Sequence, residues 1–366
     1  MKALKKLGNR IFIEGLTGMA HGLFATLIIG TIIQQIGTLI GGNVGGMIYL
    51  IGKIAAALTG AGIGVGVAYR FKESPLVVLS SAVAGMIGAF ASKIIAGSIM
   101  LSEQVNWEEL VLAKESIILS GPGEPLGAFL AAYIGIEVGR LCAGKTKVDI
   151  IVTPIVTIGA GSVVGIILGP PISKFMTMLG ELINWGTEQQ PLLMGIIVSV
   201  LMGMILTLPI SSAALGLILN LSGLAAGAAT IGCCCNMVGF AVASYRENKV
   251  GGLLAQGVGT SMLQVPNIVK KPIIWLPAIL SSAILGPIGT MVFGMTNNAT
   301  GSGMGTAGLV GQIMTWQDMI GTHTPEILLV KMLLIQIILP AVLTLVFSEA
   351  MRKKGWIKYG DMKLDL

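Results

Sequence analysis

Long apolar segments recur along the whole chain, and they constrain its fold more than any other feature. A helix needs about 20 residues to cross a bilayer, and nine segments are long enough. They cover residues 18–40, 45–69, 76–100, 117–142, 150–168, 192–216, 221–245, 273–293 and 327–347. Charged residues make up only 11% of the 366 positions, against about 25% in soluble domains. The sequence therefore predicts an all-α polytopic membrane protein.

Two further apolar segments are shorter and rich in glycine, at residues 251–265 and 301–314. Their length suits re-entrant segments or broken helices better than full spans. The pair Pro170-Pro171 predicts the end of the fifth helix. The mixed polar and apolar residues that follow predict an amphipathic connector at about 172–188. In total we expect about nine to eleven membrane segments.

Three collinear matches between the first and second half of the chain predict an internal duplication. Their offsets drift only from 173 to 176 to 182 residues. The matches pair residues 22–30 with 195–203, 69–70 with 245–246, and 120–124 with 302–306. A duplicated membrane domain is typical of transporters, where substrate binds near the membrane midplane between the halves.

The duplication predicts a first half at 1–188, a second half at 189–350 and a basic tail at 351–366. Lysines and arginines gather in both terminal regions, and the net charge is +6. Such clusters favour the cytoplasmic side of the membrane. We therefore expect a multi-pass protein of the bacterial cytoplasmic membrane, with both termini in the cytoplasm. We expect no nucleic-acid partner.

Glu124 is the sharpest candidate for a functional side chain. It follows Gly123 in a stretch, residues 119–126, whose two glycines and two prolines prevent a regular helix. A carboxylate in an apolar environment is costly, and it usually faces a cavity, a partner or the route of a substrate. Together with unpaired backbone groups it can bind a hydroxyl-rich ligand. The alternative is that Glu124 caps the following helix.

The second half offers uncharged candidates. The glycine-rich stretch at 301–308 contains Thr306 and is followed by Gln312; its alternative is a flexible loop between spans. Asn236, Gln256 and Gln264 also lie in apolar segments. Each of these alone is more often a helix–helix hydrogen bond than a ligand contact. Together with a single carboxylate they favour a site for a neutral polyol or sugar.

His21 begins the first apolar segment and is a candidate contact for a substrate hydroxyl. An interfacial histidine bonded to water or a carbonyl is the alternative. The chain has only two histidines, which excludes a multi-histidine metal site. It contains no Walker loop, no zinc-protease motif and no nucleophile elbow. We therefore expect no metal, no cofactor and no catalytic residue on this chain.

Several long blocks give the sequence a recognisable likeness, at residues 147–154, 232–246, 252–266 and 301–312. They resemble the membrane subunit IIC of the bacterial phosphotransferase system (PTS), in the branch that includes perfringolysin-regulator-like proteins. The resemblance covers nearly the whole chain. It implies a homodimeric permease that moves a sugar by an elevator-like or rigid-body rearrangement. It also implies a separate cytosolic IIB protein as phosphoryl donor, because this chain carries no IIA or IIB domain.

The same resemblance bears on Glu124. In the glucose superfamily of these permeases, a loop of the form Gly-x-Thr-Glu-Pro supplies a carboxylate that binds substrate. Residues 121–125 keep the glycine, glutamate and proline of that form. They depart from it by having Gly123 in place of threonine, and by lying in the first half of the chain rather than late.

Two classes of function follow. One is a permease for a sugar or a similar small polar solute, and the other is a membrane-embedded sensor or regulator that retains the permease fold. The polar candidates lie in membrane segments while the cytoplasmic parts are short, which favours transport. As an enzyme the chain is at most the membrane component of a sugar phosphotransferase.

Overall fold

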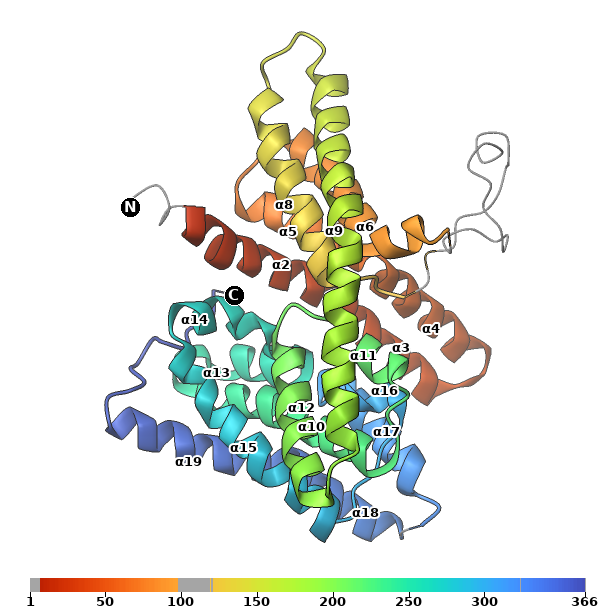
Figure 1. The fold of residues 1–366 in the computed structure, drawn as a ribbon, viewed down its shortest axis with the longest axis vertical. Helices are drawn as coiled ribbons and strands as arrows, with labels where there is room; N and C mark the ends of the chain where they lie inside the picture. Colours follow the sequence, from red (N-terminus) through yellow and green to blue (C-terminus); the bar gives the residue numbers. More distant parts are fainter. Residues whose placement is uncertain (1–6, 98–118, 120, 323, 366) are drawn as a thin grey trace. The chain divides into compact units, whose positions relative to one another are not determined.

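The computed structural model describes residues 7–97, 119, 121–322 and 324–365, which form helices joined by short connections (Figure 1). The all-α class predicted from the sequence is confirmed. The chain divides into two compact units, Met1–Phe175 and Met176–Leu366. Parts of the predicted segments 76–100 and 117–142, and Ser120 of the repeat match, lie outside the described residues.

The first unit begins with one long helical run, Leu7–Ile40, which starts well before the apolar segment predicted at 18–40. Five further described helices follow it, and the last continues into the second unit. The elements are η1 (Arg10–Gly15), α2 (Leu16–Leu23), η2 (Phe24–Ile28), α3 (Ile29–Ile40), α4 (Gly42–Ala57), α5 (Thr59–Arg70), α6 (Pro75–Ile95), α8 (Pro125–Cys142) and α9 (Asp149–Thr187).

The apolar segment predicted at 45–69 is a bent pair rather than one straight span. Helices α4 and α5 meet at an angle of 52°. At the bend the Thr59 hydroxyl donates to the Ala56 carbonyl at 2.6 Å. This local bond competes with the regular helical pattern and is a common cause of helix bending.

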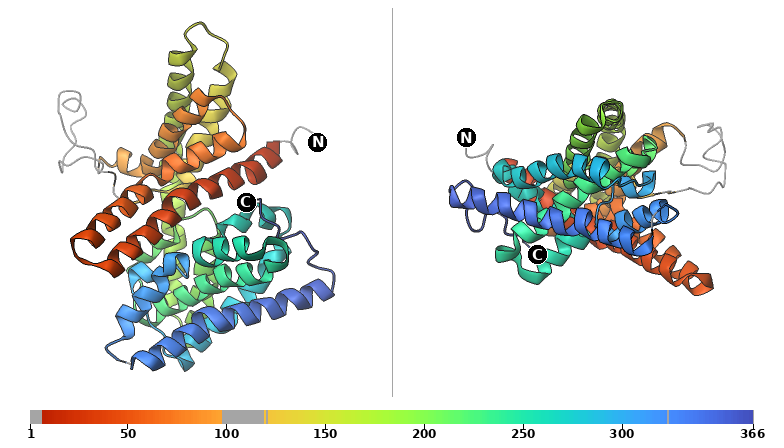
Figure 2. Two further views of the ribbon diagram at one scale, coloured as in Figure 1. Left: turned by 180° about the vertical axis from the view of Figure 1, so that it is seen from behind. Right: turned by 90° about the horizontal axis from the view of Figure 1, so that it is seen from below.

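Glycines allow the helices of the first unit to approach closely, as in the α3–α4 hairpin (Figure 2). A side chain on Gly22 of α2 would overlap the backbone carbonyl of Gly62 in α5. In membrane proteins such small-residue contacts provide much of the packing between helices. The high glycine content therefore serves backbone contact within the bundle.

The prediction that Pro170-Pro171 ends a helix is wrong. Helix α9 runs unbroken from Asp149 to Thr187, with Pro154, Pro170 and Pro171 inside it. Each proline removes only one backbone donor, and apolar surroundings keep the remaining helical bonds favourable. The segment predicted as a connector, 172–188, is thus mostly the last part of α9, and the boundary between the compact units falls within it.

The second unit combines long apolar helices with short broken ones. The elements are α10 (Pro191–Thr207), α11 (Ser212–Ile218), α12 (Gly223–Ala243), α13 (Tyr245–Leu254), η3 (Ala255–Gly259), η4 (Ser261–Gln264), α14 (Val265–Lys270), η5 (Pro272–Trp275), α15 (Leu276–Pro287), η6 (Ile288–Val292), α16 (Ala299–Ser302), η7 (Ala307–Leu309), α17 (Val310–Met319), α18 (Pro325–Met332), η8 (Leu333–Ile338) and α19 (Leu339–Lys353).

Helix α12 is the centre of the second unit and packs against α10, α15 and α19. Nearly all of its side chains are buried, including Cys233, Cys234 and Cys235. This agrees with the small apolar character of those residues and makes α12 the scaffold for the polar groups described below.

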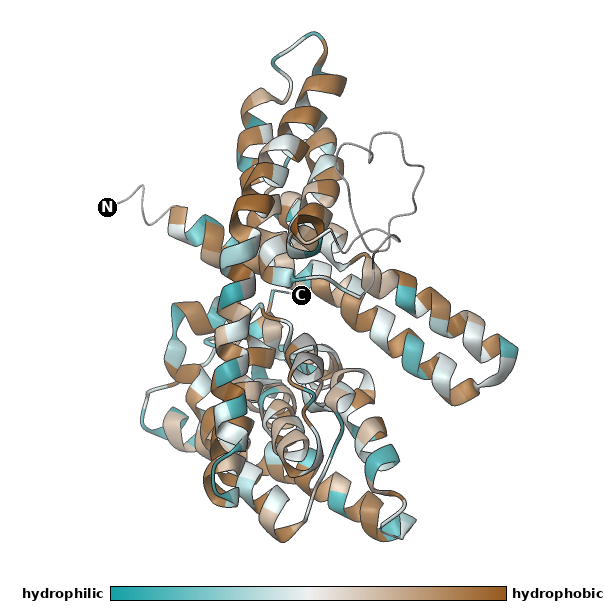
Figure 3. Ribbon diagram, turned by 45° about the vertical axis from the view of Figure 1, so that its right-hand side comes forward, coloured by the Kyte–Doolittle hydropathy of each residue, from teal (hydrophilic) through white to brown (hydrophobic). Residues whose placement is uncertain are grey.

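Seven described helices are long and apolar enough to cross a membrane, and the bent pair α4–α5 makes an eighth candidate. Apolar residues follow these helices along their length (Figure 3). The shorter α10 corresponds to the remaining predicted segment. The two glycine-rich segments fold as short successive elements, η3–η4–α14 and α16–η7–α17. Broken helices were predicted at both places, and this is confirmed.

Candidate functional site

The loop before α8 is held against α6 in the first unit. Gly123 has a φ of +70°, and a side chain there would come within 2.7 Å of the Ala89 methyl group. The backbone N–H of Glu124 donates to the Ala89 carbonyl at 2.8 Å. Ala89 lies six residues before α6 ends at Ile95, or about 9 Å along the helix axis. The backbone of Glu124 therefore lies beside α6, about 9 Å before the C-terminal end of that helix.

The Glu124 side chain caps α8. Its carboxylate accepts the N–H of Leu126 at 3.4 Å, and Pro125 occupies the first helical position. Capping was the alternative role considered for this residue. The contact is long for a hydrogen bond and uses one carboxylate oxygen. Within the described part of the chain, the other carboxylate oxygen remains for a ligand.

His21 lies elsewhere in the first unit. It lines a pocket of about 760 Å³ with Glu14, Gly66, Tyr69, Arg70, Lys72 and Glu73. Arg70 donates to Glu14 across this pocket at 2.6 Å. Glu124 is not among the lining residues, so the structure does not bring these two candidates into one pocket. Glu14 is spaced seven residues from His21, two helical turns on the same face, and that spacing was a signal for the pocket.

In the second unit the glycine-rich loop is packed on the middle of α12. Gly305 has a φ of +52°, and a side chain there would come within 2.8 Å of the Cys233 Cβ. Next to it, the Thr306 hydroxyl donates to the Met237 sulfur at 3.6 Å. Asn297, at the start of the loop, donates to the Thr230 hydroxyl at 2.7 Å. The loop is therefore anchored, and it is not the flexible connection considered as its alternative.

Gln312 follows this loop and carries an unpaired acceptor. Its Nε2 donates to the Gln336 Oε1 at 3.2 Å and to the Cys234 sulfur at 3.5 Å. Its Oε1 is buried and has no hydrogen-bond partner among the described residues. Gln336 in turn donates to the Thr315 hydroxyl at 3.0 Å. A buried carbonyl without a donor costs free energy, and a ligand hydroxyl can supply that donor.

Asn236 is bonded on all sides. Its Oδ1 accepts the indole N–H of Trp275 at 2.8 Å and the hydroxyl of Thr207 at 3.2 Å. Its Nδ2 donates to the Gly232 carbonyl and the Ser282 hydroxyl at 3.1 and 3.4 Å. The side chain is completely buried. These contacts tie α12 to α10 and α15, which corresponds to a helix–helix hydrogen bond.

Gln256 and Gln264 are brought together and are also fully bonded. The Gln264 Nε2 donates to the Gln256 Oε1 at 2.9 Å and to the Met362 carbonyl at 3.0 Å. The Gln256 Nε2 donates to the Ser244 hydroxyl at 2.9 Å, and the Gln264 Oε1 accepts from Asn267 at 2.9 Å. Both side chains are completely buried. They form an amide pair that joins the broken segment to the C-terminal residues.

The candidates in the second unit thus fall into separate groups. Thr306 and Gln312 contact one face of α12, through Met237 and Cys234, whereas Asn236 faces α10 and α15. Two residues near Gln312 were not predicted from the sequence: Thr315 and Gln336. Gln336 is an isolated amide in the apolar segment 327–347, and such an amide is the signal that identifies it.

A family profile described as "Phosphotransferase system, EIIC" matches residues 13–364. The match covers both compact units, including the loop before α8 and the loop before α17. No curated protein matches the sequence.

Proposed function

Because this multi-pass membrane protein belongs to the phosphotransferase-system EIIC family, we propose that it is a permease for a sugar or a similar small, neutral, polar solute. A cytosolic IIB-type protein would act as phosphoryl donor, and the permease would be a homodimer with both termini in the cytoplasm. The chain itself supplies solute contacts and no catalytic residue.

The observation that carries this proposal is the buried, unpaired Oε1 of Gln312 beside an anchored broken helix. A sugar hydroxyl both donates and accepts hydrogen bonds. It therefore complements a site made of amides and hydroxyls such as Gln312 and Thr306. An inorganic cation would instead require several carboxylate or carbonyl oxygens. Residues 297–312 contain no acidic side chain and therefore offer no carboxylate.

The predicted duplication gives further support. Gly30 aligns with Gly203 in the first of the three matches. A side chain on Gly30 would lie 2.7 Å from the Ala56 nitrogen, and one on Gly203 would lie 2.5 Å from the Gly232 carbonyl oxygen. Each aligned glycine thus lies against the backbone of another helix in its own unit, which is compatible with the repeats found in transporters.

In this proposal Thr306 and Gln312 contact the solute in the second unit, and Glu124 is a separate candidate contact in the first unit. The Gln312 Oε1 accepts a hydrogen bond from a solute hydroxyl, the Thr306 hydroxyl donates or accepts one, and the Glu124 carboxylate can only accept. Rearrangement of the permease would then expose this site to each side of the membrane in turn.

Uptake into proteoliposomes, measured over a panel of sugars and small acids, tests the proposal. Glu124→Gln is the informative variant, because glutamine keeps an acceptor oxygen for the Leu126 N–H while removing the charge. We expect uptake of the preferred sugar to fall about tenfold or more, as for a lost hydrogen bond to a charged group. Unchanged uptake would remove Glu124 from the site, and solute binding without uptake by the unmodified protein would favour a sensor.

A further inference from the structure

The C-terminal strap, residues 355–365, is folded into the core of the second unit. Ile357 and Met362 are buried, with 2% and 0% of their surface exposed, against Phe240, Ile268 and Trp275. A basic tail that only carried charge would leave such side chains in water. The strap is therefore a structural part of this unit.

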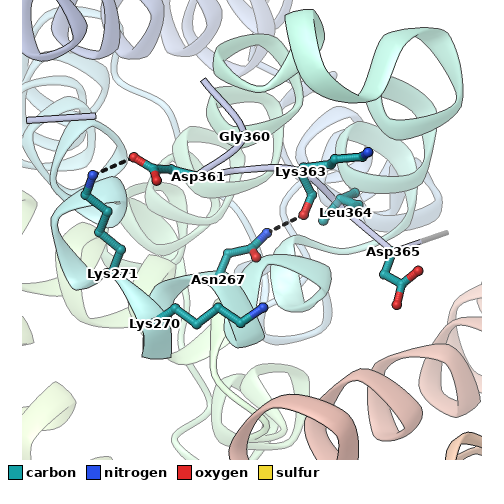
Figure 4. A pocket seen from close by; sticks show the side chains of 8 residues that line it. All are labelled: Asn267, Lys270, Lys271, Gly360, Asp361, Lys363, Leu364 and Asp365. Atoms are coloured by element: carbon teal, nitrogen blue, oxygen red, sulfur yellow. Dashed lines mark hydrogen bonds and ion pairs between the residues drawn. The ribbon is translucent and has the colours of Figure 1, made fainter. Parts of the chain in front are cut away.

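Backbone groups of the strap bond to side chains of the broken segment. The Met362 carbonyl accepts from the amides of Asn248 and Gln264 at 2.8 and 3.0 Å. The Lys363 carbonyl accepts from Asn267 at 2.8 Å (Figure 4), and the Leu364 N–H donates to the Asn248 Oδ1 at 2.8 Å. Three side-chain amides are thus oriented by the strap.

Two ion pairs hold the strap in place. Glu247, whose side chain is completely buried, bonds to Arg352 at 2.9 Å, just before the strap begins. The same carboxylate accepts the N–H of Gly360 at 3.2 Å. Farther along, Lys271 bonds to Asp361 at 2.6 Å (Figure 4). One pair fixes the start of the strap and the other fixes the residue directly before Met362.

The orientation of the Gln256–Gln264 pair depends on these contacts. The Nε2 of Gln264 has two N–H groups, and Gln256 and Met362 take them both. Without the Met362 carbonyl, one N–H group of the Gln264 amide would lose its acceptor, and only the bonds to Gln256 and from Asn267 would hold the amide. A buried amide network is stable only when every member is satisfied, so loss of one acceptor disturbs the whole pair.

We propose that the C-terminal strap is a positioning element for the Gln256–Gln264 amide pair. The Lys271–Asp361 ion pair holds the strap against the end of α14. This inference rests on the proposed function and adds to it that segment 251–265, whose Gln256 and Gln264 the sequence predicts as solute contacts, belongs to the solute path. Lys271 and Asp361 touch no solute in this account. They act by fixing Met362, which fixes Gln264.

Two adjacent lysines provide a matched test. Lys270 and Lys271 both line a pocket of about 390 Å³ between α14 and the strap. Lys271 pairs with Asp361, whereas Lys270 makes no ion pair among the described residues. Lys271→Gln and Lys270→Gln therefore remove the same charge from the same pocket. Only Lys271→Gln breaks the ion pair with Asp361.

The test uses two experiments. The first measures hydrogen exchange of residues 255–268 in detergent, and the second measures KM and Vmax for sugar uptake. We expect Lys271→Gln to speed exchange and to raise KM about twofold to fivefold, the range of one partly exposed ion pair, with Vmax retained. Lys270→Gln should match the unmodified protein in both. The charge swap Lys271→Asp with Asp361→Lys should restore both values.

Each result decides the proposal. Unchanged exchange in Lys271→Gln would overturn it, and so would faster exchange with an unchanged KM, because the amide pair would then lie outside the solute path. An equal effect of Lys270→Gln would also overturn it, since general loss of positive charge would explain the result. If the unmodified protein transports no solute, the proposed function fails, and the exchange result alone judges whether the strap orders the segment.

Discussion

Two buried amides in the second unit, Asn236 and Gln312, contact the same helix and differ in how their hydrogen bonds are filled. Asn236 lies on α12 and is bonded at every position, while Gln312 reaches α12 from a broken segment and keeps one acceptor unpaired. A filled amide stabilises the contact between helices. An amide with an open acceptor leaves a place for a ligand. The difference separates structural from functional polar groups in a membrane where both are buried.

The largest expected effect concerns the backbone that anchors Gln312. Gly305 and Gly294 both have positive φ, of +52° and +61°, but only Gly305 has neighbours where a side chain would be. We expect Gly305→Ala to lower the free energy of unfolding by roughly 2–5 kcal/mol, from left-handed strain plus overlap with Cys233. Gly294→Ala should cost only the strain, about 1–2 kcal/mol. Thermal unfolding in detergent measures both, and equal losses would show that the loop is not pressed on α12.

The next prediction concerns the filled amide. Asn236→Leu keeps the side-chain size but leaves the Trp275 N–H without its acceptor and the Gly232 carbonyl without one donor. We expect a loss of about 2–3 kcal/mol in the free energy of unfolding, the cost of buried groups left unsatisfied. Denaturation in detergent gives the value. A loss below about 0.5 kcal/mol would mean that the network is not what joins α12 to α10 and α15.

Much of this fold could be predicted from the sequence, because apolar length and glycine content act locally. The broken segments at 251–265 and 301–314 follow from being too short and too rich in glycine to span. The course of α9 through Pro170-Pro171 could not be predicted in the same way. Whether a helix tolerates proline depends on its surroundings, and a local pattern does not contain them.

The candidate site was less predictable, since nearly every face of α12 is apolar and buried. Thr230, Cys234 and Met237 recur on one face and meet the loop, whereas Gly232 and Asn236 share another. Without an exposed polar face, the sequence does not tell which of these faces meets the broken segment. Gln312 was predicted from its place after the glycine loop, and Gln336 was missed because it approaches from a distant helix.

The open amide gives the opposite prediction to Asn236. Gln312→Met keeps the length of the side chain and removes the buried acceptor that has no donor. We expect stability in detergent to change by less than about 1 kcal/mol, because one unpaired acceptor is removed while the Gln336 Oε1 loses its donor, and solute binding to weaken about fivefold. Isothermal titration with the transported sugar measures the second effect. A clear loss of stability with unchanged binding would place Gln312 with Asn236 among the structural amides.

The smallest expected effect concerns Gln264, an amide whose hydrogen bonds are all made. Asp361 acts on it through the neighbouring strap residue Met362. Partial burial alone would raise the pKa of the Asp361 carboxyl, but its bond to Lys271 outweighs this and the pKa is lowered. A carboxyl with a lowered folded pKa stabilises above its unfolded value of 3.8, and the contribution is lost as the pH falls through the folded pKa. Asp361→Asn should therefore cost less than about 1 kcal/mol at pH 7, and progressively less as the pH falls below 3.8. Unfolding curves of both proteins between pH 7 and 2 measure the difference. If the difference in the free energy of unfolding is the same at each pH, the ion pair does not help to hold Gln264. Gln264 would then be held by its hydrogen bonds alone.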